Sequence, residues 1–375
     1  MSSGPIPPIA TVRAVAIIQQ RDPETTKAAL AAWLGGKLPA ATGIEIEVAG
    51  ASEVSGFSSD TIIFDATWNE SGTPRRQGYV VRAAPIGEAV FEKYEIGLQY
   101  RIMRAVRDRS AVKVPEVFWL EDDDAVLGAP FFAMERLDGR IPADNPPYTL
   151  GGWVTDATPA QRRTMWLSGI DTLAEIAAFD WRAAGLHELD RTDYGRLGQE
   201  QLVRWQREYY EWARRKPMPV VDHAWEWLAA NRPDDDHLVG FCWGDARLGN
   251  LMFDEHFEVR AVFDWEMARA GNPEFDLAWF LFFDRHFTEG IGIPKLDGIP
   301  SDEESIARWE ARVGRRAEHL EYYTVFTMVW FAGIMARVIQ SNIAHGAPAA
   351  ELGSMETNNL VTQLLAKHFG IPPQD

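Results

Sequence analysis

The stretch that decides the fold is Phe241–Phe280, which reads FCWGDARLGNLMFDEHFEVRAVFDWEMARAGNPEFDLAWF. A short apolar strand is expected to end at Asp245, and Asn250 is the fifth residue after it. A hairpin-like segment then leads to a second strand that ends at Asp264, and Asp276 opens a helix twelve residues later. Polar side chains therefore stand at fixed offsets, at the ends of apolar strands.

This spacing suits phosphoryl transfer. In that chemistry an Asp accepts the proton of the attacking hydroxyl, while an Asn and a second Asp hold magnesium against the ATP phosphates. Asp245-x-x-x-x-Asn250 has the catalytic-loop spacing, and Asp264 stands where the metal-binding Asp would stand. Oxygen ligands suit magnesium. Each residue alone is more often a loop-capping Asp or Asn, but the three at these offsets favour the functional interpretation.

The rest of the chain divides by pattern into two parts. Before residue 137, strands are expected at 44–48, 61–68, 78–84, 114–120 and 130–136, with helices at 24–36 and 90–107. After residue 140, helices are expected at 159–180, 199–216, 222–231, 275–287, 302–313, 317–345 and 355–369, with short strands at 239–243 and 259–263. We therefore predict an α+β protein with a lead-in (1–20), an antiparallel-sheet lobe (21–137) and a mostly helical lobe (138–375). A cleft between two lobes is a favoured place for a ligand.

Composition limits the function classes. The 375 residues are 46% hydrophobic and 25% charged, which excludes a disordered, collagen-like or coiled-coil protein. The 37 basic and 55 acidic residues give a net charge of −18, which opposes binding to nucleic acid or to an anionic membrane. That charge would suit a cationic substrate, although acidic cytoplasmic proteins are common. The single cysteine, Cys242, excludes an intrachain disulfide.

No signal peptide is visible at the start of the sequence. The longest apolar runs, 277–283 and 329–336, are too short to cross a bilayer and resemble core helices. We therefore expect a cytoplasmic protein without a membrane or nucleic-acid partner.

The decisive stretch resembles the signature of the aminoglycoside phosphotransferase and choline-kinase-like family, whose members are related to the protein kinases. The resemblance rests on residues 244–250 (GDARLGN) and 264–266 (DWE), with 276–278 (DLA) in support. It is closest to the branch also found fused to acyl-CoA dehydrogenases, and it covers about residues 55–365. It implies a two-lobed protein-kinase-like fold and an ATP- and Mg²⁺-dependent small-molecule kinase that phosphorylates a substrate hydroxyl.

The resemblance also assigns roles in the helical lobe. Asp245 would be the catalytic base, and Asn250 and Asp264 would be the magnesium ligands. Asp276 would brace the catalytic loop through hydrogen bonds. Arg247 would position that loop or the transferred phosphate, with an ordinary surface salt bridge as the alternative.

On the nucleotide side, the resemblance implies a phosphate-covering loop at residues 55–61 (SGFSSDT), which an ordinary hairpin turn would explain equally well. The third strand would present a cation to the α- and β-phosphates, and the strand at 130–136 would lead to a hinge where adenine binds. The implied nucleotide-binding residues are Ser58, Ser59, Thr61, Arg82, Met134, Glu135 and Leu137.

Three positions depart from the family pattern. Trp243 replaces the usual His two residues before Asp245, and we expect it to pack in the same place. Arg82 replaces the usual Lys. Gln99 stands where a carboxylate partner for Arg82 is expected, so either Glu95 takes that role or the pair is absent.

Several alternatives stay open at this stage. The departures allow a nucleotide-binding pseudo-enzyme that acts as a scaffold or sensor. A metal-dependent phosphatase would need more clustered Asp and His ligands than the sequence offers. The acceptor is an aminoglycoside-like compound, a hydroxyacyl compound or another metabolic alcohol, and the choice between ATP and GTP and the oligomeric state are equally open.

Overall fold

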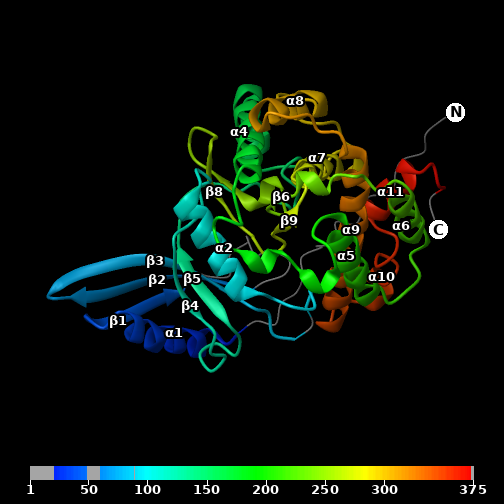
Figure 1. The fold of residues 1–375 in the computed structure, drawn as a ribbon. Helices are drawn as coiled ribbons and strands as arrows, with labels where there is room; N and C mark the ends of the chain where they lie inside the picture. Colours follow the sequence, from blue (N-terminus) through cyan, green and yellow to red (C-terminus); the bar gives the residue numbers. More distant parts are fainter. Residues whose placement is uncertain (1–20, 49–59, 88, 373–375) are drawn as a thin grey trace.

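A five-stranded antiparallel sheet in the order β1-β2-β3-β5-β4 forms the first lobe of the computed structural model, which describes residues 21–48, 60–87 and 89–372 (Figure 1). Its strands are β1 (Ala41–Val48), β2 (Asp60–Glu70), β3 (Thr73–Ala83), β4 (Val117–Glu121) and β5 (Phe131–Glu135). Helix α1 (Pro23–Lys37) precedes the sheet, and α2 (Ile96–Arg109) lies between β3 and β4. The predicted sheet with one inserted helix is confirmed.

Alternation along β5 explains how the sheet is covered on both faces. Phe131 and Ala133 belong to a core shared with α1, whereas Phe132 and Met134 belong to the large core of α2 and the helical lobe. Successive side chains of a strand point to opposite faces. A strand buried on both faces therefore reads as a continuous apolar run, as β5 does. In Figure 1, α1 lies under one face of the sheet and α2 lies on the side of the helical lobe.

Helix α2 begins six residues later than the predicted start at residue 90. The preceding segment, residues 89–95, is attached to the helical lobe instead. The hydroxyl of Tyr209 donates to the carbonyl oxygen of Val90 at 3.0 Å, and the guanidinium of Arg337 donates to that of Ala89 at 2.7 Å. These contacts use backbone groups that a longer helix would have needed for itself.

The second lobe is mostly helical. Its helices are α3 (Trp153–Asp156), α4 (Pro159–Ala177), α5 (Gln199–Ala213), α6 (Pro219–Ala230), α7 (Glu274–His286), α8 (Asp302–Val313), α9 (Leu320–Ala344), α10 (Ala349–Leu352) and α11 (Leu360–His368). Its short strands pair as β6 (Gly240–Cys242) with β9 (Arg269–Gly271) and β7 (Leu251–Phe253) with β8 (Val259–Val262). Helix α4 begins at Pro159 as predicted, because Thr158 forms a capping box with Gln161.

Helix α9 is the central helix of the helical lobe and packs on α7. It is the one helix of the described residues that is long and apolar enough to cross a membrane, and 89% of its most apolar window is buried inside the protein. Burial of this kind is typical of a core helix. The helix predicted at 317–345 is confirmed, and its apolar part is longer than the run at 329–336 that the sequence indicated.

Candidate active site

The predicted catalytic loop, residues 244–250, is fixed at its start by Asp276 in the first turn of α7. One carboxylate oxygen of Asp276 accepts from the backbone N–H of Trp243 at 2.6 Å, and the other accepts from that of Gly244 at 2.9 Å. The side chain is buried, and burial raises its pKa to about 6. This is the bracing role that the resemblance implied for Asp276.

Glycine is required at position 244, directly before Asp245. Its φ is +98°, and a Cβ at this position would lie 2.2 Å from the carbonyl oxygen of Met267. Only glycine tolerates both the positive φ and the close approach of another backbone. The turn that presents Asp245 therefore depends on the absence of a side chain.

Trp243 is fully buried and occupies the place expected for the family's His. Its indole N–H is shared between the carbonyl oxygens of Phe263, at 2.8 Å, and Asp264, at 3.0 Å. Asp264 has a φ of +60°, which is uncommon for a residue other than glycine. Trp243 thus joins the catalytic loop to the backbone that carries the predicted metal ligand.

The carboxylate of Asp245 accepts hydrogen bonds from three side chains in the described part of the chain. The Nδ2 of Asn250 donates to Oδ2 at 2.6 Å, and the indole of Trp279 donates to Oδ1 at 2.9 Å. The Nε of Arg247 lies 3.1 Å from Oδ1 and 3.0 Å from Oδ2. Burial raises the pKa of Asp245; Arg247 opposes that effect, and the charge of Asp264 adds to it. A raised pKa brings a carboxylate closer to what a general base needs near neutral pH.

Arg247 is buried and does not form the surface salt bridge that was its alternative. Its guanidinium pairs with both Asp245 and Asp144. Burial lowers the pKa of Arg247, but the two carboxylates raise it overall. Sequence reasoning missed Asp144, because it lies in a loop with no motif around it.

Arg82 reaches from β3 across to the helical lobe. Its Nη2 lies 2.7 Å from the Oδ1 of Asp264 and 3.2 Å from the Oε2 of Glu266. Although burial lowers the pKa of Arg82, the charges of these two carboxylates raise it overall. The cation predicted for the phosphates and the Asp predicted for the metal are therefore in direct contact. Glu266 was not predicted as a site residue, although it belongs to the DWE triplet that carried the resemblance.

The carboxylate partners of Arg82 come from the helical lobe and not from α2. Glu95 precedes the first residue of α2 and pairs with Arg191 instead. Gln99 is buried, and its Nε2 has no hydrogen-bond partner among the described residues. Glu95 therefore does not take the role that was left open for it.

The predicted nucleotide residues are only partly described. Ser58 and Ser59 lie outside the described residues. Thr61 is described, and the sheet register places it opposite Arg82 on the neighbouring strand. Ser58, Ser59 and Thr61 stay predictions as phosphate contacts.

At the end of β5, Met134 is buried and Glu135 and Leu137 are half-buried. The N–H of Glu135 donates to the carbonyl oxygen of Glu116 at 2.8 Å, and the N–H of Arg136 donates to that of Gly78 at 3.2 Å. Neither N–H is left for adenine. Adenine recognition at Glu135 would therefore fall to its carbonyl oxygen, and Met134, Glu135 and Leu137 stay predictions.

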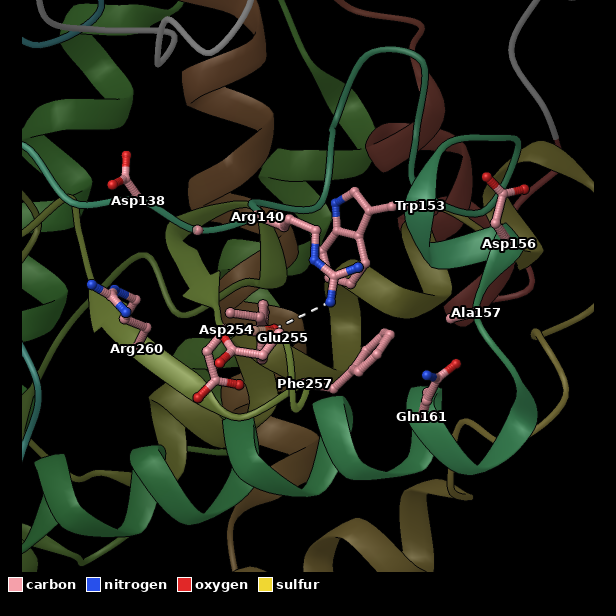
Figure 2. Close-up of a pocket in the computed structure, with 12 residues that line it drawn as sticks. Asp138, Arg140, Trp153, Asp156, Ala157, Gln161, Asp254, Glu255, Phe257 and Arg260 are labelled. Atoms are coloured by element: carbon pink, nitrogen blue, oxygen red, sulfur yellow. Dashed lines mark hydrogen bonds between the residues drawn. The ribbon is translucent and has the colours of Figure 1, made fainter.

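A hollow of about 690 Å³ lies beside the segment that follows β5. It is lined by residues 138–140, the start of α4 and the β7–β8 hairpin (Figure 2). Arg140 is its central side chain, with its guanidinium 4.6 Å from the ring centre of Trp153 and 4.5 Å from that of Phe257. None of the described residues predicted for the site lines this hollow. It is therefore separate from the Asp245 site.

The donor atoms that the described residues offer decide whether a magnesium ion fits this site. No group of three or more His, Cys, Asp or Glu side chains that could hold a metal occurs within the described ranges. Asn250 and Asp264 offer oxygen donors only, and Mg²⁺ commonly takes one or two carboxylates with the remaining ligands from substrate phosphates and water. The residues present fit a magnesium ion that binds together with a nucleotide.

The model of the phosphotransferase enzyme family, APH, matches residues 55–312. The chain belongs to the APH phosphotransferase family. Its two-lobed fold, with an antiparallel sheet and a helical lobe, is the fold of that family.

Two relatives are acyl-CoA dehydrogenase family proteins. Acyl-CoA dehydrogenase family member 11 of Gallus gallus is 32% identical over 54% of this APH chain and 25% of its own length. The probable acyl-CoA dehydrogenase IBR3 of Arabidopsis thaliana is 27% identical over 76% of this chain and 36% of its own length. The chain thus spans only about a quarter to a third of these relatives.

Solved structures show the same fold. A protein named as a candidate aminoglycoside phosphotransferase from Ralstonia eutropha matches 91% of this APH chain and 98% of its own, with a TM-score of 0.64 and 26% identity. An aminoglycoside phosphotransferase, APH(4)-Ia, solved with AMP-PNP and hygromycin B, covers 90% of this chain and 98% of its own, with a TM-score of 0.51 and 14% identity.

Proposed function

We propose that this protein is an ATP- and magnesium-dependent kinase that transfers the γ-phosphate to the hydroxyl of a small molecule. The observation that carries the proposal is a convergence of side chains: Asn250 donates to Asp245, the charge of Asp264 acts on Asp245, and Arg82 reaches Asp264 from the other lobe. A cation, two oxygen ligands and a carboxylate base are the parts that phosphoryl transfer needs.

Each group has a definite task in this proposal. Asp245 orients the acceptor hydroxyl and takes its proton as the oxygen attacks the γ-phosphorus, while the bond from that phosphorus to the β–γ bridging oxygen breaks and ADP leaves. Arg82 exchanges its contact with Asp264 for the phosphates, which a guanidinium binds bidentately. Asn250 and Asp264 would hold magnesium, which neutralises charge on the phosphate oxygens when bound. Catalysis then comes from positioning and electrostatics, without a covalent intermediate.

For the acceptor we propose a hydroxylated acyl compound. Support comes from the relatives, which are named as acyl-CoA dehydrogenases and are 27% and 32% identical. The structure solved with an aminoglycoside is 14% identical, so it supports the fold and not the substrate. The net charge of −18 suits an aminoglycoside cation, so aminoglycosides are the alternative acceptor class in the transfer experiment below.

The first experiment measures thermal stability with Mg²⁺ alone, with ATP alone and with both, in the wild type and in Asp264→Ala. At one hundred times its dissociation constant a ligand adds about 2.7 kcal/mol of stability. We expect a magnesium-dependent shift with ATP that Asp264→Ala loses. The absence of a shift at millimolar MgATP would contradict the nucleotide site.

The second experiment follows transfer of the labelled γ-phosphate to hydroxyacyl-CoA compounds, simple alcohols and aminoglycosides. Transfer to the acyl class supports the full proposal. Transfer to aminoglycosides alone would keep the kinase and overturn the acceptor. A clear MgATP shift with no transfer to any acceptor would favour the pseudo-enzyme.

A further inference from the structure

Helix α7 contacts the catalytic loop at two points. Asp276 accepts from the backbone N–H groups that precede the base, as described above. Trp279, three residues later, donates its indole N–H to the Oδ1 of Asp245 at 2.9 Å. Residues three apart on a helix lie on the same face. The same face of α7 therefore holds both the backbone of the loop and the side chain of the base.

The indole of Trp279 is rigidly held. Its side chain is fully buried, and its ring centre lies 5.4 Å from that of Phe275 and 5.6 Å from that of Phe283 on the same helix. From α9, the ring centres of Trp330 and Phe331 lie 5.9 Å and 6.2 Å away. A large ring in a close-packed interior cannot turn without displacing its neighbours. The direction of its N–H is therefore fixed by the core.

The other two donors to Asp245 have further partners or further tasks. Arg247 divides its guanidinium between Asp245 and Asp144. Asn250 also donates to the backbone oxygen of Asp245 and is the predicted metal ligand. Both belong to the catalytic loop, so both move when the loop moves. Trp279 is the donor to Asp245 that belongs to a packed helix outside that loop.

We propose that Trp279 is a positioning residue that aims the carboxylate of Asp245 at the acceptor hydroxyl. This inference rests on the proposed kinase function for its effect on turnover, but the contact itself is open to a separate test. A hydrogen bond to a carboxylate fixes its rotation about the Cβ–Cγ bond. Loss of the indole N–H leaves the base in place but turned away from the proton it must accept.

The test compares Trp279→Phe with Trp309→Phe on α8. Both changes remove a fully buried indole, but the Nε1 of Trp309 has no hydrogen-bond partner in the part of the chain that the structure describes, and Trp309 is not among the rings that hold Trp279. Hydrogen bonds to charged groups correspond to a factor of roughly 10 to 100 in rate. We expect Trp279→Phe to lower kcat by that factor with the KM for MgATP unchanged, and Trp309→Phe to stay within about threefold of the wild type in kcat. An equal loss in both variants, or a loss only in KM, would overturn the inference.

A spectroscopic measurement tests the contact without any turnover. The sequence has 15 Trp residues, and the indole N–H resonance of Trp279 is the one missing in Trp279→Phe. In Asp245→Ala, which removes the acceptor, this resonance should move upfield while that of Trp309, the one missing in Trp309→Phe, stays in place. The experiment decides the contact even where no phosphate acceptor is found. Where Trp279→Phe fails to fold, the indole resonances of Asp245→Ala are compared as a set with those of the wild type, and one of them should move upfield. A resonance that is identical in Asp245→Ala and the wild type would overturn the inference.

Discussion

Asp245, the proposed base, shows how its surroundings prepare a carboxylate. It is largely buried beside Asp264, which raises its pKa, and three side-chain donors among the described residues hold its two oxygens. Donors at both oxygens define the direction of the remaining lone pairs. Two of these donors, Arg247 and Asn250, belong to the same motif as Asp245, and the third, Trp279, lies outside it.

For the base itself, we predict that Asp245→Asn lowers kcat by about 100- to 10,000-fold, the range associated with loss of a general base. The amide keeps the size of the side chain but takes up no proton. Nucleotide binding should be largely retained, because the proposed phosphate and metal contacts are Arg82, Asn250 and Asp264. Phosphate-transfer kinetics and the MgATP thermal shift measure the two properties separately. Wild-type turnover in Asp245→Asn would contradict the assignment.

Among the elements, α7 has two different ends: one holds the predicted catalytic loop, and the other is buried among aromatic side chains. Its first turn carries Asp276, and its last turn carries His286, which is buried among aromatic rings including Phe282 and Phe331. The Nδ1 of His286 has no hydrogen-bond partner within the described ranges. Burial lowers the pKa of His286 from 6.5 to about 4. The end of α7 is therefore compatible only with a neutral imidazole.

This buried imidazole predicts a loss of stability in acid. Between pH 6.5 and about 4 the unfolded chain binds a proton at His286 that the folded chain excludes, so the free energy of unfolding falls as the pH falls. By pH 5 the loss from this group is about 2 kcal/mol. Urea unfolding at pH 7 and pH 5 should show a smaller pH dependence in His286→Phe than in the wild type. The control is His256→Phe, because the His256 side chain is 77% exposed and should leave the pH dependence unchanged.

Across the whole molecule, the buried contacts of Arg82 with Asp264 and Glu266 join the sheet to the helical lobe. A buried charge without a partner is costly. We therefore predict that Arg82→Met destabilises the protein by about 3–5 kcal/mol, because two carboxylates lose their counter-charge. Urea unfolding measures this change.

A matched control for Arg82 is available on the surface. Arg75→Met removes the arginine of an exposed pair with Glu70, in which the two side chains are 54% and 41% exposed. Exposed pairs contribute about 0–1 kcal/mol. Equal stability of Arg82→Met and Arg75→Met would show that the contact between the lobes contributes little to folding.

The sequence by itself determined the order of the longer elements and the central motif of this protein, since both are local. Periodicity over a few residues distinguished strands such as β5 from helices such as α4, and fixed spacing singled out Asp245, Asn250 and Asp264. The short elements β9, α3 and α10 were not predicted. The start of α2 was misplaced, because the carbonyl groups of Ala89 and Val90 are held by Arg337 and Tyr209, which lie 248 and 119 positions further along the chain.

Only the tertiary structure decided which side chains of the site contact one another. The contacts of Arg82 with Asp264, of Arg247 with Asp144 and of Asp245 with Trp279 join residues 182, 103 and 34 positions apart. No local pattern encodes such pairs, because they depend on how packed elements bring distant side chains together. Burial and the charge of Asp264 then raise the pKa of Asp245. Arg82 pairs with carboxylates of the helical lobe and not with a residue of α2.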